Sequence, residues 1–366
     1  MQTGKITSKQ FIAAIYKTQV GIGILTLPRE LAEKSGSAGI ISLVISWGLT
    51  IVLSFFIIHS IRKCPGLSFP EILNRLFGRP LGWILNLLWL LYAFYSAAIV
   101  LFNAIYLIQI WILQEVSSYN LALLMLIPIY MVSRRTEREL GRYGEFVFLS
   151  SIWLYPMLFF PLRDANILNL LPIFPEGFTP VFRSVPVAAF SYLGLEVSFF
   201  LYPHHIKPEK AFRDLVIANT ISTTLYLGVT IISYVFFNID QIQHHLWPTL
   251  ELLKTVEFSF IERFEIIFLP YYLIVITYTS IMYLFISSRT ASFLLKKQSH
   301  VPVLRISCLV IFGTTLFFEP GYGDIQSMAR ISSFIAYFIY AFPILLWVRT
   351  LFLRKPIKEE VNYEAT

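Results

Sequence analysis

At the centre of the first apolar run of the chain lies the stretch Gln19-Val20-Gly21-Ile22-Gly23-Ile24-Leu25-Thr26-Leu27-Pro28. Glycine inside a helix costs about 1 kcal/mol relative to alanine, and proline removes a backbone donor. The stretch therefore predicts a helix that is broken near its middle. Inside a bilayer a broken backbone is tolerated only where protein or a water-filled cavity satisfies the freed polar groups, so the break marks a candidate site. The alternative is an unbroken span in which the two glycines permit close helix packing.

The composition is that of an integral membrane protein. The 366 residues are 56% hydrophobic and only 14% charged, whereas about a quarter of the residues in soluble domains are charged. No soluble domain fits between the apolar runs, so residues 1–366 are expected to form a single transmembrane domain. We find no Ser/His/Asp or Cys/His constellation, phosphate loop, cofactor motif or metal-ligand spacing, and therefore predict neither an enzyme nor a metal site. Nucleic acid is not expected as a partner, because the basic residues flank apolar runs.

The apolar runs predict ten transmembrane helices, since a span needs about 20 predominantly apolar residues. Their approximate ranges are 11–33, 39–61, 81–113, 117–133, 145–162, 184–203, 211–237, 264–288, 301–318 and 329–353. With all ten counted, most of the Lys and Arg residues lie on one side of the membrane. The positive-inside rule makes that side cytoplasmic and places both termini there. The basic clusters are interpreted as topology determinants beside anionic membrane lipid, with partner docking as the alternative.

A second break is predicted in the sixth helix, within Phe190-Ser191-Tyr192-Leu193-Gly194-Leu195-Glu196-Val197. Here a helix-weakening glycine stands beside a carboxylate inside an apolar span. Interrupted helices at the first and sixth of ten positions are typical of an inverted repeat with a site at the membrane midplane. The two repeats would cover about 8–162 and 184–353, followed by a short cytoplasmic tail at 354–366.

Four motifs together resemble one family. They are Gly21-Ile-Gly-Ile-Leu-Thr-Leu-Pro-Arg29, Tyr192-Leu-Gly-Leu-Glu-Val197, Leu246-Trp-Pro-Thr249 and Ile261-Glu-Arg-Phe-Glu265. The chain is similar to the B subunits of spore nutrient-germinant receptors, a family within the amino acid–polyamine–organocation transporter superfamily. The resemblance implies an all-α, ten-helix LeuT-type fold with a 5+5 inverted repeat in the inner membrane of a bacterial spore. It also implies association with an A subunit and a lipoprotein C subunit.

The two breaks suggest how a small zwitterion would bind. A helix that restarts near Gly21 to Ile24 offers free N–H groups and a positive dipole end to a carboxylate. The interruption at Leu193-Gly194 would offer backbone carbonyls to an ammonium group. The residues Ile22, Gly23, Ile24, Leu193 and Leu195 flank the breaks, which predicts a small or branched apolar amino acid as ligand. A sugar or nucleoside remains an alternative.

Two ionisable residues lie at bilayer depth. A carboxylate such as Glu196 is costly there and is a functional candidate by default, either for ligand contact or for proton handling. Its alternative role is structural, as a hydrogen-bond acceptor for the loosened backbone of its own helix. Lys17 lies one turn before Gly21 and is predicted to pair with Glu196, or else to extend its stem to the cytoplasmic face.

Polar side chains on the third and eighth helices complete the candidate site. Tyr92 and Ser96 share one face at i,i+4 spacing, as do Thr279 and Tyr283. From the family resemblance, Tyr92, Ser96, Thr277 and Tyr278 are expected to line the cavity. Between the seventh and eighth helices, apolar residues in the range 246–256 recur at helical spacing and predict an amphipathic helix. This helix would cover the cavity, contact a partner or pack on the membrane surface.

The leading functional prediction is a receptor subunit that binds an amino acid-like germinant and signals to partner subunits. A ligand can signal only if it binds one conformation more tightly than another. The alternative is a proton-coupled amino acid permease that uses the same site. A third class is a structural, water-conducting or ion-conducting component with no ligand of its own.

Overall fold

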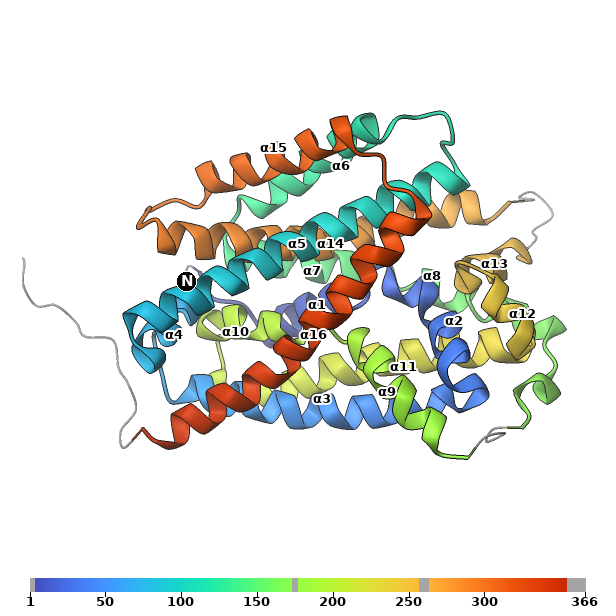
Figure 1. Cartoon of the computed structure of the whole chain (residues 1–366), viewed down its shortest axis with the longest axis horizontal. Coiled ribbons are helices and arrows are strands. Elements are labelled where there is room, and N and C mark those ends of the chain that lie inside the picture. Colours follow the sequence, from blue (N-terminus) through green and yellow to red (C-terminus); the bar gives the residue numbers. More distant parts are fainter. Residues whose placement is uncertain (1–3, 173–176, 257–262, 354–366) are drawn as a thin grey trace, which may run out of the picture.

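The computed structural model of the chain describes residues 4–172, 177–256 and 263–353 (Figure 1). The predicted tail at 354–366 and the first two residues of the motif at 261–265 lie outside the described residues. Within the described part the secondary structure is helical, apart from one isolated bridge between Ile6 and His205.

The helices of the first half are α1 (Ser8–Gln19), α2 (Gly23–Ser35), η1 (Gly36–Ala38), α3 (Gly39–Arg62), α4 (Phe69–Phe77), α5 (Arg79–Trp111), α6 (Ser118–Ser133), α7 (Glu137–Ser150), α8 (Leu154–Met157), η2 (Phe160–Asp164) and η3 (Ile167–Leu170). Those of the second half are α9 (Thr179–Phe190), η4 (Leu195–Val197), α10 (Ser198–Leu201), η5 (Tyr202–His204), η6 (Pro208–Lys210), α11 (Ala211–Phe236), α12 (Ile239–His244), α13 (Pro248–Lys254), α14 (Glu265–Leu294), α15 (Val301–Phe317) and α16 (Tyr322–Leu351).

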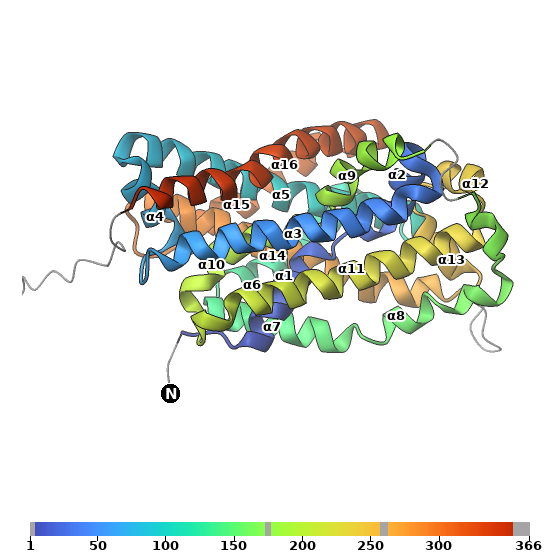
Figure 2. The same cartoon turned by 90° about the horizontal axis from the view of Figure 1, so that it is seen from below.

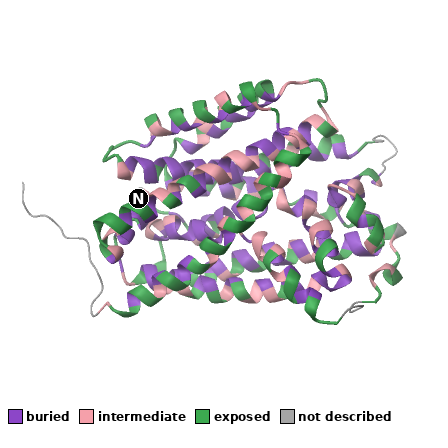
Figure 3. Ribbon diagram, in the orientation of Figure 1, coloured by how far each residue is buried: buried purple, intermediate pink, exposed green. Residues whose placement is uncertain are grey.

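The long helices run roughly along one axis, with the N-terminus near one end and α12 and α13 at the other (Figures 1 and 2). We call these the N-terminal end and the α13 end. Helix α14 packs along α5 and is the most enclosed of the long helices, with a nearly continuous buried stretch from Tyr278 to Ser288 (Figure 3). Helices α3, α15 and α16 carry exposed apolar side chains on their outer faces, as expected of helices that contact lipid.

All ten predicted runs contain helix in the structure, although turns or bends interrupt the runs 11–33, 145–162 and 184–203. Six helices among the described residues are long and apolar enough to cross a membrane, and the pair Thr179–Phe190 and Leu195–His204, bent by 44°, would make a seventh. The helices α6 and α15 are apolar but shorter. The prediction of an α-helical membrane protein is confirmed at this level, and ten complete spans stay a prediction.

The first helix is interrupted where the glycines predict it, but the proline does not cause the break. Helix α1 ends at Gln19 and α2 begins at Gly23, whereas Pro28 lies inside α2. A proline inside a helix leaves the carbonyl four residues earlier without its amide donor. That carbonyl belongs to Ile24, and it accepts a hydrogen bond from Thr249 Oγ1 on α13 at 2.9 Å. Helix α2 therefore continues through Pro28 because another helix supplies the missing donor.

The second interruption rests against the first. Helix α9 ends at Phe190, and the chain passes through Gly194, at φ +115°, into η4. An added Cβ at Gly194 would lie 2.9 Å from Gln19 N and 3.0 Å from Thr18 C. Both the backbone conformation and the close approach to α1 require glycine at this position.

Replacement of Gly194 by alanine should destabilise the protein by at least about 1–2 kcal/mol, because an L-residue is strained at this φ. The added methyl group would also push α1 away from η4. The measurement is the apparent melting temperature of the detergent-purified protein, followed by fluorescence-detected size exclusion. Gly48→Ala is the matched control, because Gly48 is helical with open space around its Cβ position. Equal melting temperatures for the two variants would contradict the role assigned to Gly194.

The N-terminal end is held together by a short extended segment. Ile6 N donates to His204 O at 2.8 Å, and Ile206 N donates to Ile6 O at 2.9 Å. The buried His205 accepts from Lys207 N through Nδ1 at 2.9 Å, so its Nε2 carries the proton that faces Asp214 Oδ2 at 3.1 Å. Burial lowers the pKa of His205, although Asp214 acts in the opposite direction. The neutral imidazole is therefore the form that this segment contains.

Because the folded-state pKa of His205 is lowered, its contribution to stability is present above the unfolded pKa of about 6.5 and is lost as the pH falls. Protonation also removes the Nδ1 acceptor of Lys207. We expect the hydrogen-exchange protection factors of the Ile6 and Ile206 amides to decrease between about pH 7 and pH 5. His205→Asn, which does not titrate, should lose this pH dependence. Protection that is constant with pH in the unsubstituted protein would refute the expectation.

Candidate functional site

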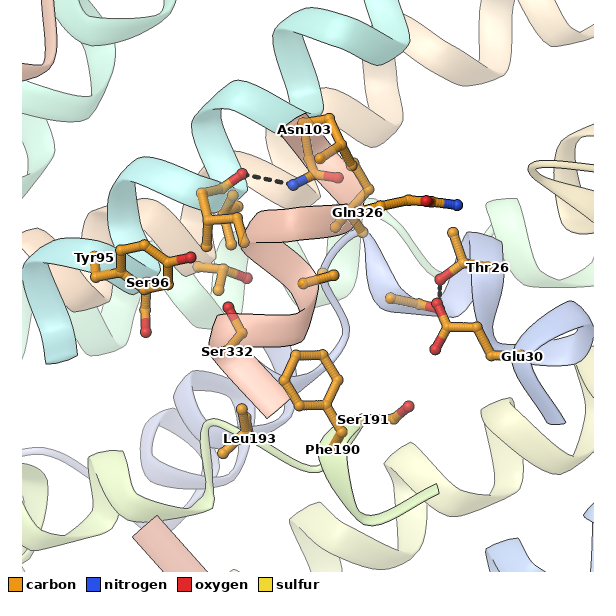
Figure 4. A pocket seen from close by; sticks show the side chains of 18 of the residues that line it. Thr26, Glu30, Tyr95, Ser96, Asn103, Phe190, Ser191, Leu193, Gln326 and Ser332 are labelled. Atoms are coloured by element: carbon orange, nitrogen blue, oxygen red, sulfur yellow. Dashed lines mark hydrogen bonds between the residues drawn. The ribbon is translucent and has the colours of Figure 1, made fainter. Parts of the chain in front are cut away.

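A cavity of about 190 Å³ lies beside both helix breaks (Figure 4). Residues of α1, α2, α5, α14 and α16 surround it, together with the end of α9 and the segment before α13. Its lining residues are Thr18, Gln19, Gly21, Ile22, Gly23, Thr26, Arg29, Glu30, Tyr92, Tyr95, Ser96, Ile99, Val100, Asn103, Tyr106, Phe190, Ser191, Leu193, Leu246, Trp247, Thr279, Tyr283, Tyr322, Ile325, Gln326, Ala329, Ser332 and Ile335. The volume is below the range of about 300–1,000 Å³ typical of drug-sized sites, which favours a small ligand.

The cavity extends from the breaks towards the α13 end. On α5 its lining runs from Tyr92 to Tyr106, which corresponds to about 21 Å of helix. Leu246 and Trp247, which precede α13, also line it. Further along the range 246–256, Leu250 and Val256 are fully buried.

A buried carboxylate lies behind the inner part of the cavity. Glu196 Oε1 accepts hydrogen bonds from the hydroxyls of Tyr92 at 2.7 Å and Tyr283 at 2.6 Å. Its Oε2 accepts the N–H of Gly194 at 2.8 Å. Glu196 is 3% exposed and does not line the cavity, whereas both tyrosines do. Because their O–H groups point to the carboxylate, the tyrosines offer oxygen lone pairs to a ligand.

The backbone groups freed at the breaks are bound by side chains of other helices. Tyr226 OH on α11 donates to Gln19 O at 2.9 Å and Ser191 O at 2.8 Å, and so joins the two breaks. Tyr272 OH on α14 donates to Gly21 O at 2.8 Å. At the start of α2, in contrast, no side chain caps the helix and Leu25 N donates to Ile22 O at 3.0 Å. The N–H groups of Ile22 and Gly23 precede the first intrahelical acceptors, and both residues line the cavity. The arrangement leaves donors, rather than acceptors, available at the first break.

The predicted ion pair between Lys17 and Glu196 is not formed in the structure. Lys17 is fully buried, and its Nζ contacts Ser151 Oγ and lies 2.8 Å from Tyr155 OH. The rings of Tyr16 and Tyr155 lie 5.0 and 5.4 Å from the ammonium group. Lys17 therefore projects to the α7–α8 region, and it does not extend to the surface. Its neighbours are hydroxyls and aromatic faces rather than a carboxylate.

Six predicted site residues line the cavity: Gly21, Ile22, Gly23, Tyr92, Ser96 and Leu193. Four others lie beside the breaks without lining it: Ile24, Gly194, Leu195 and Glu196. Thr277 and Tyr278 lie away from it. Tyr278 OH donates to Leu140 O at 3.1 Å, and Thr277 Oγ1 donates to Ile274 O within its own helix. The face of α14 next to the cavity is instead that of Thr279 and Tyr283, so the expectation for Thr277 and Tyr278 was wrong.

Sequence reasoning missed most of the outer part of the cavity. It did not assign Gln326 and Ser332 of α16 or Glu30 of α2 to the lining (Figure 4). It also missed Arg29, whose ion pair is with Glu33 at 3.2 Å. Trp247 lies in the range 246–256, for which covering the cavity was one of three alternatives, but it was not itself assigned to the lining. The i,i+4 spacing of Thr279 and Tyr283 was the one signal that identified the correct face of α14. Among the described residues no group of three or more His, Cys, Asp or Glu side chains could hold a metal ion.

The chain resembles proteins of known families along nearly its whole length. Residues 5–320 match the family described as "Spore germination protein". Spore germination protein YndE of Bacillus subtilis is 25% identical over 94% of this chain and 96% of its own length. Spore germination protein GerQB of Bacillus cereus is 28% identical over 69% and 70% of the two chains. The crystal structure of MhsT in complex with L-phenylalanine superposes with a TM-score of 0.65, at 14% identity, and covers 93% of this chain and 88% of that one.

The apolar helices and the structural likeness to MhsT define an integral membrane protein with a LeuT-type transporter fold. Within that class the chain belongs to the spore germination protein family, as the sequence motifs predicted. Neither the family nor the fold is of an enzyme class.

Because Lys17 and Glu196 have separate partners, their neutralisation should affect stability nearly additively. We expect the effects of Lys17→Met and Glu196→Gln to sum to that of the double variant within about 0.5 kcal/mol. The measurement is denaturant unfolding in detergent. As a positive control, Lys17→Met combined with Tyr155→Phe should deviate from additivity, since these two side chains are in contact. A double variant of Lys17 and Glu196 that is much more stable than the sum would indicate a buried ion pair after all.

Proposed function

We propose that this chain is the nutrient-sensing B subunit of a spore germinant receptor, and that it binds an amino acid-like germinant in the cavity at the two breaks. An A subunit and a lipoprotein C subunit in the spore inner membrane would receive the signal. Family membership supports the receptor role. The ligand assignment rests on one observation. Backbone N–H donors at the start of α2 lie on one side of the cavity, and the phenolic oxygens of Tyr92 and Tyr283, oriented by Glu196, provide acceptors on another.

The ligand's two ends would bind on different elements. Its carboxylate would accept from the N–H groups of Ile22 and Gly23, where the helix dipole also favours negative charge. Its ammonium group would donate to the oxygens of Tyr92 and Tyr283, whose negative potential the buried Glu196 increases. Glu196 is in this proposal a positioning residue, since its three hydrogen bonds orient the tyrosines and Gly194. The apolar side chains of Ile22 and Leu193 would select a small or branched apolar side chain.

The same proposal includes the membrane topology. Ten spans in two inverted repeats, 8–162 and 184–353, are supported by helices in all ten predicted positions and by interruptions in the first and sixth. The distribution of Lys and Arg supports cytoplasmic termini. In this orientation the cavity extends to the outer face of the inner membrane, from which a nutrient would arrive.

A proton-coupled amino acid permease is the second candidate. It is favoured by the likeness to the fold of MhsT, whose crystal structure contains L-phenylalanine. The same cavity would then serve alternating access, and Glu196 and Lys17 would be the groups available for proton handling. Flux is the property that separates the two candidates, because a receptor requires only a conformational difference between bound and free states.

Ser96→Phe should abolish or alter the germination response, because the new ring would occupy the cavity between the two breaks. Spores that carry this variant would be scored against a panel of amino acids, sugars and nucleosides, with subunit abundance checked by immunoblot. The expected result is a loss of sensitivity to one nutrient of at least about tenfold, since displacing a ligand carboxylate or ammonium from its partners removes more than about 1.4 kcal/mol. Leu91→Phe, on the exposed face of the same helix, is the control and should respond normally.

Normal responses of Ser96→Phe spores across the panel would refute a germinant site in this cavity. Proteoliposomes that contain the unsubstituted chain would then be assayed for amino acid uptake with and without a proton gradient. Uptake that Ser96→Phe removes would support the permease. A change in water or ion permeability without any effect on ligand response would favour a conducting component.

A further inference from the structure

A second groove, of about 510 Å³, lies on the membrane-facing side of the bundle between α3, α9 and α16. These three helices lie side by side in both views (Figures 1 and 2) and contact one another. Most of the lining is apolar, and side chains such as Val52, Tyr337 and Ile344 are 50, 61 and 44% exposed. The groove is separate from the germinant cavity, although Phe190 lines both.

The groove has the length of a lipid acyl chain. Its lining on α3 runs from Ser46 to Phe56, which is about 15 Å along the helix, and on α16 from Ser333 to Ile344. Its base is fixed, because Ser46 Oγ donates to Val185 O of α9 at 3.2 Å and Tyr340 OH of α16 donates to Ala189 O. A bilayer presents an abundant occupant of matching shape to a fixed apolar groove of this kind.

Two cations line the groove where α2 ends and α9 begins. They are Lys34, in the last turn of α2, and Arg183, in the first turns of α9. Both side chains are exposed, and among the described residues neither forms an ion pair. Two unpaired cations at one end of an acyl-sized groove complement an anionic headgroup more closely than a zwitterionic one.

We propose that this groove binds one anionic phospholipid, with an acyl chain along α3 and α16 and its phosphate between Lys34 and Arg183. The lipid then packs against the last turn of α9, and through Phe190 it supports the wall of the germinant cavity. This places a structural lipid beside the second helix break, independently of which ligand the cavity takes.

The test uses the full chain in bilayer nanodiscs doped with photoactivatable phosphatidylglycerol, with cross-linked peptides mapped by mass spectrometry. We expect labelling of residues on α3 and α16 that line the groove, with competition by unlabelled phosphatidylglycerol but not by phosphatidylcholine. Lys34→Gln and Arg183→Gln should each reduce this labelling about fivefold, and the double variant about twentyfold. Arg163→Gln, an exposed cation outside the groove, is the control and should label normally.

A second pair of variants tests the shape of the groove without changing charge. Val52→Trp should reduce labelling at the groove, because the ring occupies the acyl position, whereas Val44→Trp lies outside the lining on the same helix and should not. Both valines are exposed, so the variants are expected to fold. Equal labelling by phosphatidylcholine, labelling unaffected by either set of variants, or displacement by soluble glycerol phosphate would each overturn the proposal.

Discussion

The architecture depends on one constraint, which is that polar backbone freed inside an apolar environment must find a partner. The first two helical segments leave the carbonyls of Gln19, Gly21 and Ile24 without helical donors, and hydroxyls of Tyr226, Tyr272 and Thr249 bind them. Each hydroxyl comes from a different helix, α11, α14 or α13. The break is therefore not a local irregularity, because three distant parts of the chain must be in place before it is tolerated.

At the second break the freed backbone N–H of Gly194 finds its partner in a carboxylate. Glu196 lies two residues after Gly194 and binds its N–H, so the residue that follows the break also caps it. A carboxylate can accept about four hydrogen bonds, so the N–H of Gly194 alone would leave most of its acceptor sites without a donor. The hydroxyls of Tyr92 and Tyr283 supply two more and connect the break to α5 and α14. The contacts of Glu196 are those of the structural interpretation, and they also connect it to two tyrosines that line the cavity. A ligand at the tyrosines would act on the backbone of Gly194 through it.

The sequence was sufficient for the membrane class and the family, because the apolar composition and the four motifs are local properties of the chain. Its glycines also marked the stretches at which α1 and α9 end, whereas Pro28 lies inside α2. It was less informative about which face of a helix meets the cavity. Tyr278 and Thr279 are adjacent in sequence but point to different neighbours, and the difference depends on how α14 is rotated against α5 and α7. The partners of Lys17 were out of reach for a similar reason, since Ser151 and Tyr155 lie more than a hundred residues away. Depth along a helix can be counted from a sequence, whereas rotation about its axis is set by tertiary packing.

The cavity and the two breaks also limit how a bound ligand could be sensed. A ligand held by α2 on one side and by Tyr92 and Tyr283 on the other would connect two elements that no continuous helix joins. Tyr226 bridges Gln19 and Ser191, so a displacement of either break would reach α11 without any contact between α11 and the ligand. Such a shift requires that the ligand bind one arrangement of the breaks more tightly than another. The small volume of the cavity favours that selectivity, because a ligand that fills it cannot keep both sets of contacts when the breaks separate.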